Sequence, residues 1–212
     1  TPLLWAAASA AQAETTISTA VTTPVATATA NAGAPDDLTI ASGGSVKPTG
    51  GTAVTLNSDN DVSIAGTVAI TDANNATALL IEGGRTGEVT LSGTLTVDES
   101  TTASDSDSDG DLDGPFATGS NRHGVRVTGS EAFHGSIVQT AGAITVEGDD
   151  SAGVSAETAV DGSIRTAGSV SVTGDRAYGV HAASTVGGDV RTTGAVGVLG
   201  EGAVAVAVDQ TV

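Results

Sequence analysis

The run DSDSDGDLDG, residues 105–114, carries the residue types best suited to holding a hard metal ion. Carboxylates at the first, third, fifth and ninth places, with glycine at the sixth, match the start of an oxygen-ligand calcium loop, where the glycine makes a sharp turn. The pattern therefore predicts a candidate calcium loop. Its five alternating aspartates are Asp105, Asp107, Asp109, Asp111 and Asp113.

Two features of this run argue against a strong calcium site. The twelfth place holds Phe116, where a bidentate glutamate is expected, and Pro115 excludes the helix that usually begins there. We expect either weak calcium binding, with a Kd of about 10⁻⁴ to 10⁻³ M, or an acidic solvated loop without an ion. Calcium in this loop would make it rigid and relieve charge repulsion, and it would not perform catalysis.

Catalytic groupings are scarce in the rest of the chain. The hexapeptide GDDSAG resembles the GDSGG nucleophile motif of trypsin-like proteases, but the same pattern returns 26 residues later with Ala177 in place of Ser151. The histidines His123, His134 and His181 show no metal-ligand spacing, and we expect each to be an exposed turn residue. From these residues we predict no enzymatic activity.

Two arginines leave one enzymatic alternative open. Arg165 and Arg191 are 26 residues apart, which places them at equivalent positions of a repeat. Polysaccharide lyases with a β-helical fold use such a face, where carboxylates bind calcium and an arginine takes the proton. The alternative function is therefore a secreted carbohydrate-active enzyme. Since no aspartate cluster accompanies the arginines, a ladder of surface charge is the simpler interpretation.

A repeat of about 26 residues organises most of the chain. The segments SAGVSAETAVDGSIRTAGSVSVTGDR and AYGVHAASTVGGDVRTTGAVGVLGEG, beginning at Ser151 and Ala177, align without a gap. Further back, VSIAGTVAI at 62–70 matches VTLSGTLTV at 89–97. Apolar residues alternate within each unit, which predicts strands with one buried face. Frequent glycines and β-branched residues argue against helices.

This repeat predicts an all-β protein, a right-handed parallel β-helix, or solenoid, with coils of about 26 residues. Three short strands fill each coil, and coils stack ~4.8 Å apart so that equivalent valines and isoleucines form columns. About five coils would make a rod ~24 Å long. We assign 51–212 to the β-helical repeats and 14–50 to an N-terminal leader or cap, whose Thr- and Ala-rich start is either disordered or a first capping strand.

The acidic run interrupts this repeat. In ordinary units eight residues separate one strand's last valine from the next unit's first valine, whereas 28 residues separate Val97 from Val125. We therefore place the run in a loop insertion, residues 98–121, at a corner of the coil. Loops lengthen there without disturbing the stack.

Composition limits the partners of this chain. With 25 acidic and 7 basic residues the formal net charge is −18, which repels nucleic acid and anionic lipid headgroups. One Trp, one Tyr and two Phe cannot fill a thick core, and the lack of cysteine excludes disulfides. Backbone pairing between coils must therefore supply much of the stability. Nucleic acid is not expected as a partner.

The first thirteen residues, TPLLWAAASAAQA, are typical of the end of a signal peptide. The apolar run is too short to span a bilayer, and Ala-Gln-Ala is a small-x-small pattern that predicts cleavage after Ala13. A buried N-terminal helix is the rival interpretation. We expect the protein to be exported from the cytoplasm.

The ordered series GGTAVTLNSDNDVSIAGTVAI, DSDGDLDGPFATGSNRHGVRVTG and VEGDDSAGV resembles the N-terminal passenger region of Gram-negative autotransporters, especially those of alphaproteobacteria. The resemblance covers roughly residues 39–212. It implies export through the periplasm and passage through an outer-membrane β-barrel translocator that belongs to the same full-length chain, beyond Val212. It also implies a β-helical passenger at the cell surface. The expected function is a structural stalk or adhesin-like module, with a host, cell-surface or glycan ligand that the sequence does not identify.

Overall fold

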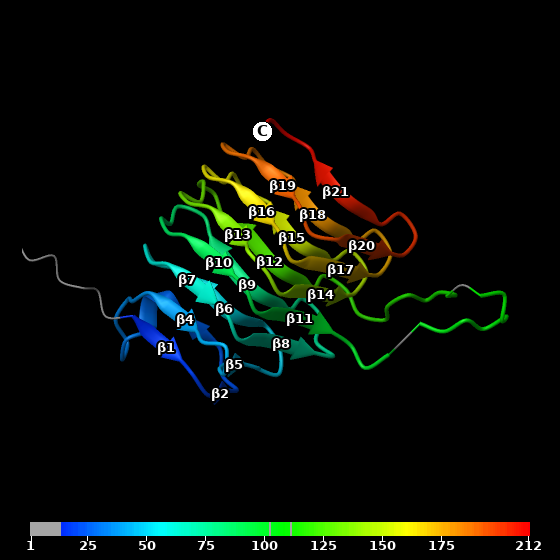
Figure 1. The fold of residues 1–212 in the computed structure, drawn as a ribbon, viewed down its shortest axis with the longest axis horizontal. Coiled ribbons are helices and arrows are strands. Elements are labelled where there is room, and N and C mark those ends of the chain that lie inside the picture. The colour runs from blue at the N-terminus through cyan, green and yellow to red at the C-terminus, as the bar shows by residue number, and fades with distance from the viewer. Residues whose placement is uncertain (1–13, 102, 111) are drawn as a thin grey trace, which may run out of the picture.

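Short strands of β-branched and small residues wind into a stack of coils. The computed structural model describes residues 14–101, 103–110 and 112–212. Each coil contributes one strand to each of three sheets, and every strand pairs in parallel with its equivalents in neighbouring coils. Figure 1 shows the stack running from the first coil in blue to the last coil in red. The parallel β-helix predicted by the repeat is confirmed.

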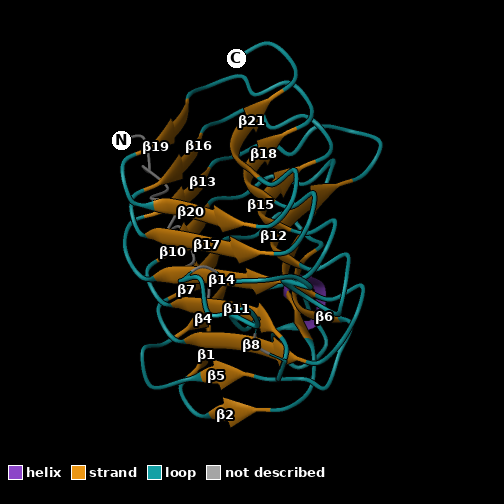
Figure 2. Cartoon of the chain, turned by 90° about the vertical axis from the view of Figure 1, so that its right-hand side faces the viewer, coloured by secondary structure: helices purple, strands orange, loops and turns teal. Residues whose placement is uncertain are grey.

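Within the described residues, each of the three sheets has seven strands. The first sheet contains β1 (Thr15–Ile17), β4 (Leu38–Ile40), β7 (Val62–Ile64), β10 (Val89–Leu91), β13 (Ile137–Gln139), β16 (Ile164–Thr166) and β19 (Val190–Thr192). The second sheet, which faces the viewer in Figure 2, contains β2 (Ala20–Val21), β5 (Ser45–Val46), β8 (Thr67–Thr71), β11 (Thr94–Asp98), β14 (Ala143–Glu147), β17 (Ser169–Thr173) and β20 (Val196–Leu199). The third sheet contains β3 (Val25–Ala26), β6 (Thr52–Leu56), β9 (Thr77–Glu82), β12 (His123–Thr128), β15 (Ala152–Ala156), β18 (Tyr178–Ala182) and β21 (Val204–Val208).

The register of these strands matches the sequence repeat. Val62 pairs with Val89, and Val170 pairs with Val196, which are shifts of 27 and 26 residues. The expectation of five coils was wrong, because the sheets contain seven strands each. At ~4.8 Å per coil, six intervals give a stack of ~29 Å.

The additional coils come from the segment 14–50, which was expected to be a leader or cap. It contributes strands β1 to β5 to the three sheets, beginning at Thr15. The shifts there are irregular, since Leu38 pairs 23 residues after Thr15 and Val54 pairs 29 residues after Val25. The segment therefore stacks as coils although its sequence does not show the 26-residue period.

The core is a narrow column of inward-facing aliphatic side chains. Valines, leucines and isoleucines from all three sheets are buried along it, and among the described residues Phe133 is the largest fully buried side chain. Where the third sheet approaches the second, even a Cβ is too large: one added at Gly153 would meet Val170 and lie 2.6 Å from the carbonyl oxygen of Gly179. This close approach explains why Gly124, Gly153 and Gly179 stand at successive levels of the stack.

The only helix in the described ranges is a short 3-10 turn, η1 (Thr27–Thr29). No helix in this part of the chain is long and apolar enough to cross a membrane. The predicted signal segment 1–13, including the cleavage position Ala13, lies outside the described residues.

Candidate functional sites on the solenoid surface

The acidic insertion leaves the stack between β11 and β12, as residues 99–122. Figure 1 shows it projecting beyond the edges of the sheets. Strand β12 nevertheless pairs with β9 below and β15 above, so the stack continues without interruption on either side of the loop. The insertion is therefore displayed at a corner of an intact solenoid.

At the tip of this loop three of the predicted calcium ligands come together. Carboxylate oxygens of Asp105, Asp107 and Asp109 lie within 4.8 Å of one another, and all three residues are exposed. Asp113 does not join them, since its Oδ2 accepts hydrogen bonds from Ser106 N at 2.7 Å and Ser106 Oγ at 2.6 Å. Asp111 lies outside the described residues.

The backbone of the tip turns as the sequence pattern requires. Gly110 has φ +103°, a conformation open to glycine but strained for other residues. Asp105 accepts hydrogen bonds from Ser108 N at 2.6 Å and from Gly110 N at 3.1 Å. The donor set of three carboxylates thus fits a weak oxygen-ligand site in part, and Phe116 supplies no oxygen where the bidentate glutamate is expected.

A buried ion pair closes the base of the insertion. Arg122 Nη1 lies 2.8 Å from Glu99 Oε2, and each side chain is only 3% exposed. The guanidinium also donates to the carbonyl oxygens of Ala73 at 2.9 Å and Glu147 at 2.5 Å. Because Glu99 and Arg122 are the first and last residues of the loop, their pairing fixes the distance between its two ends.

Glu99 is held in its charged form at this base. Burial is the largest single effect and would raise its pKa, but hydrogen bonds from Thr118 N, the Arg122 guanidinium and Gly119 N together lower it below the ordinary value. These bonds are 2.7, 2.8 and 2.8 Å long. Nothing in the residue spacing links Glu99 to Arg122, so this pair could not be predicted from the sequence.

A second candidate site is an open groove of about 510 Å³ on the outer face of the third sheet. It contains the only tyrosine of the chain and two of its three histidines. We call it the Tyr178 groove. The residues that line it include Asn121, His123, Asp150, Ser155, Glu157, Arg176, Tyr178 and His181.

His123 forms part of the floor of the Tyr178 groove. Its side chain is only 6% exposed, and its Nε2 lies 3.8 Å from Glu157 Oε1. Burial, followed by the nearby charge of Arg126, lowers the pKa of His123 from 6.5 to about 4, although Glu157 acts in the opposite direction. His123 is therefore neutral at pH 7, and its buried Nδ1 has no hydrogen-bond partner within the described part of the chain.

Charged pairs stand around this floor. Arg126 donates to both oxygens of Glu157, at 2.7 and 2.9 Å. Arg176 likewise donates to both oxygens of Asp150, at 2.7 Å each, and hydrogen bonding to Arg176 lowers the pKa of Asp150. These forked contacts fix the planes of both guanidinium groups.

The third pair at this groove is His181 with Asp209, and it also orients Tyr178. The ring of Tyr178 is stacked on the ring of His181, with centroids 4.1 Å apart and an interplanar angle of 16°. His181 Nε2 lies 2.8 Å from Asp209 Oδ2. The two rings are thereby held in one orientation on strand β18.

The expectation that the histidines are exposed turn residues was wrong for two of them. His123 and His181 are strand residues of β12 and β18, and their side chains are 6% and 18% exposed. His134 fits the expectation better, because it is half-exposed, outside the named strands, and 2.5 Å from Asp161. Residue spacing does not reveal this proximity, because strands from different coils bring His123 and His181 to one face.

The remaining candidates from the sequence do not assemble catalytic groups. Ser151 is fully buried, accepts a hydrogen bond from Arg122 N and donates one to the carbonyl oxygen of Asp149. Arg165 and Arg191 are aligned on neighbouring strands of the first sheet, as predicted. Arg165 pairs with Asp189 at 2.9 Å, and the shallow groove beside the two arginines has no acidic residue among its lining residues.

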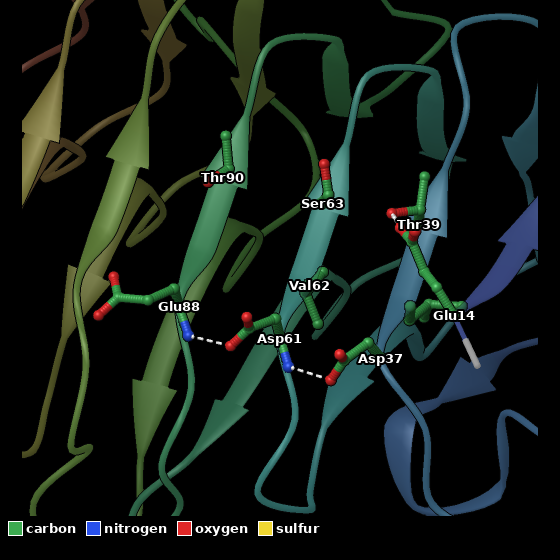
Figure 3. Close-up of a pocket in the computed structure, with 9 residues that line it drawn as sticks. Glu14, Asp37, Thr39, Asp61, Val62, Ser63, Glu88 and Thr90 are labelled. Carbon is green, nitrogen blue, oxygen red and sulfur yellow. Dashed lines mark hydrogen bonds between the residues drawn. The ribbon is translucent and has the colours of Figure 1, made fainter. Parts of the chain in front are cut away.

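Carboxylates also form a column on the first sheet (Figure 3). Asp37 accepts a hydrogen bond from Asp61 N at 3.0 Å, and Asp61 accepts one from Glu88 N at 2.7 Å. Each carboxylate thus caps the backbone of the following coil, where a strand begins. These hydrogen bonds join one coil to the next, so the column of carboxylates stabilises the stack. Successive carboxylates in the column lie one coil apart.

Comparisons of the chain with protein-family models, curated proteins and solved structures gave no match.

Proposed function

We propose that this chain is a segment of an exported, surface-exposed passenger of autotransporter type, which acts as a structural stalk and adhesin-like module. The observation that supports this most is the continuity of the stack across the insertion. Strands β9, β12 and β15 pair in register although residues 99–122 leave the stack between them. Such a fold presents loops at a distance while the scaffold stays unchanged.

The physical properties of the coil suit a stalk. Hydrogen bonds between parallel strands join each coil to the next in three sheets, so the rod holds together with small side chains and without disulfides. Successive coil formation outside the cell would oppose back-sliding of the chain during secretion. In the full-length protein, an outer-membrane β-barrel translocator in the same chain is the partner in this proposal.

In this proposal the insertion tip binds calcium weakly at the extracellular surface. Three carboxylates already lie within reach of one ion at Asp105, Asp107 and Asp109. A bound ion would reduce their mutual repulsion and hold the turn, which is a structural role.

Cell-surface labelling of the full-length protein tests this proposal. A short epitope tag inserted between Ser106 and Asp107 should be labelled by antibody on intact cells, while a periplasmic marker stays unlabelled. Val170→Asp, which places a charge in the buried column, should abolish labelling. The neighbouring Ser171→Asp points outward on the same strand and should leave it unchanged. A tag that is reached only after the outer membrane is permeabilised, or normal display of Val170→Asp, contradicts the proposal.

The register of Arg165 and Arg191 supports a second candidate, a secreted carbohydrate-active enzyme of the polysaccharide-lyase kind. Such an enzyme needs carboxylate-bound calcium beside the arginine, and no acidic residue lines the groove next to this pair. Incubation with polygalacturonate and calcium tests it. Formation of unsaturated uronate that is lost in Arg165→Ala would establish this candidate, and absence of product would remove it.

A further inference from the structure

We infer that the Tyr178 groove is a binding site for a neutral glycan chain lying along the solenoid axis. The inference deepens the proposed adhesin-like function, and rests on it, by naming the class of ligand that the surface would hold. Four observations carry it: the dimensions of the groove, its aromatic platform, its ordered polar pairs and its local charge balance.

The groove has the dimensions of a small-ligand site and the direction of the stack. Its volume of about 510 Å³ lies within the range of about 300 to 1,000 Å³ that such sites occupy. Its residues come from the coils of β12, β15 and β18, and Gly202 extends it toward β21. Equivalent positions therefore repeat every ~4.8 Å along the groove, a spacing close to the length of one hexose residue in an extended chain.

Tyr178 supplies the apolar surface that a sugar ring needs. The carbon–hydrogen faces of a hexose pack against flat aromatic rings, while its hydroxyl groups remain available for hydrogen bonds. Stacking on His181 fixes the plane of the Tyr178 ring, and the hydrogen-bonding contact of His181 with Asp209 fixes His181 in turn. A ligand therefore meets a platform whose side-chain entropy has already been lost.

The left-handed backbone conformation of Arg176 indicates that the position is occupied by arginine for its side chain rather than for the turn. Arg176 has φ +54°, and Asn121 and Asp150 have φ +54° and +52° at the equivalent corner positions. This left-handed conformation favours glycine, asparagine or aspartate over arginine. Turn geometry alone does not account for an arginine there, whereas a guanidinium aligned by both oxygens of Asp150 places ordered donors at the groove edge.

The charges of the groove favour an uncharged ligand. Asp150 and Glu157 are each paired with an arginine, and Asp209 is in contact with His181. These carboxylates are therefore poorly placed to take a cationic ligand. The net charge of −18 disfavours polyanions, and His123, in the floor of the groove, stays neutral at pH 7. Hydroxyl groups, which both donate and accept, suit such a balanced set of donors and acceptors.

Because Tyr178 is the only tyrosine, its ring signals in an NMR spectrum report on the groove alone. The chain is titrated with cellotriose and chitotriose, which are neutral, and with trigalacturonate, which is anionic. We expect at least one neutral trisaccharide to shift the Tyr178 ring signals and trigalacturonate to bind more weakly. Calorimetry with Tyr178→Ala should show a loss of affinity of about tenfold or more, whereas Tyr178→Phe should retain binding.

The matched control is Arg85→Ala, which removes a partly exposed arginine of an ion pair with Glu82, outside the groove. It should bind the sugars like the unaltered chain. Tyr178 is partly exposed, so Tyr178→Ala is expected to fold, and its circular dichroism spectrum verifies this. The inference is overturned if neither neutral sugar shifts the ring signals, if trigalacturonate binds as tightly, or if folded Tyr178→Ala binds unchanged. Surface labelling of the loop tag does not depend on the groove, so failure here leaves the test of the stalk intact.

Discussion

Replacing Arg122 by methionine should destabilise the solenoid far more than removing any exposed arginine. The substitution keeps much of the aliphatic volume but removes three donated hydrogen bonds and leaves the Glu99 carboxylate buried without its cation. Removing one partner of a buried pair typically costs about 3–5 kcal/mol. We expect a loss of that size in the free energy of unfolding, measured by urea denaturation.

The matched control for this prediction is Arg165→Met. Arg165 also pairs with a carboxylate, at 2.9 Å, but its side chain is 49% exposed. Exposed pairs contribute about 0–1 kcal/mol, so the control should unfold almost like the unaltered chain. Limited proteolysis should cleave the Arg122→Met insertion faster, because its two ends are no longer fixed. Equal stabilities of the two variants would refute the reasoning.

The pH dependence of the same pair has a definite sign. The folded-state pKa of Glu99 is lowered from the ordinary value of 4.5, so its charged form is favoured by folding. This contribution to stability is present above the unfolded pKa and is lost as pH falls through the folded one. The stability difference between the unaltered chain and Glu99→Gln should therefore be largest at neutral pH and shrink in acid. A difference that grows on acidification would contradict the assignment.

Three further predictions concern the loop tip, the glycine column and the groove floor. Calorimetry should give a calcium Kd of about 10⁻⁴ to 10⁻³ M; Asp105→Asn should weaken binding more than Asp113→Asn, since the latter carboxylate is turned toward a serine. Gly153→Ala should lower stability by about 1–3 kcal/mol through overpacking, whereas Gly197→Ala, with no atom within 4 Å of the added carbon, should be nearly neutral in denaturation. His123 should titrate near pH 4 by NMR. Because the unperturbed pKa is 6.5, the unfolded chain takes up this proton first, and the free energy of unfolding should fall as pH drops from 6.5 toward 4. A titration midpoint near 6.5 would show that the ring is not buried as described.

The coil architecture could be predicted because one physical rule repeats at every level of the stack. An inward-facing position in a parallel coil contacts its equivalents above and below, so each coil must place small or β-branched residues at the same points. Val170 and Val196 show this directly, since they are equivalent in sequence and adjacent in the sheet. The first coils could not be predicted because the turns between their strands differ in length. The constant 26-residue period is lost there, although buried and exposed residues still alternate along the strands.

The insertion could be located but the contacts at its base could not be foreseen. Periodicity reveals that residues are added between Val97 and Val125, because the next strand resumes its pattern. Periodicity carries no information about how the loop closes. Closure depends on the ion pair between Glu99 and Arg122, which the folded stack brings together. Its existence follows from tertiary geometry, and a spacing rule based on neighbouring coils cannot detect it.

The Tyr178 groove lies where repetition constrains the sequence least. Inward positions are restricted by the narrow core, to the extent that Gly153 cannot accept a Cβ without collision. Outward positions on the third sheet have no such limit, and successive coils there carry His123, Ala152 and Tyr178 at equivalent points. A rare residue at an unconstrained outward position is not required by the fold. One face of the third sheet therefore carries the only tyrosine, two histidines and Arg176, whose backbone is in the left-handed conformation. Coil stacking does not explain this set of residues, whereas a bound ligand would.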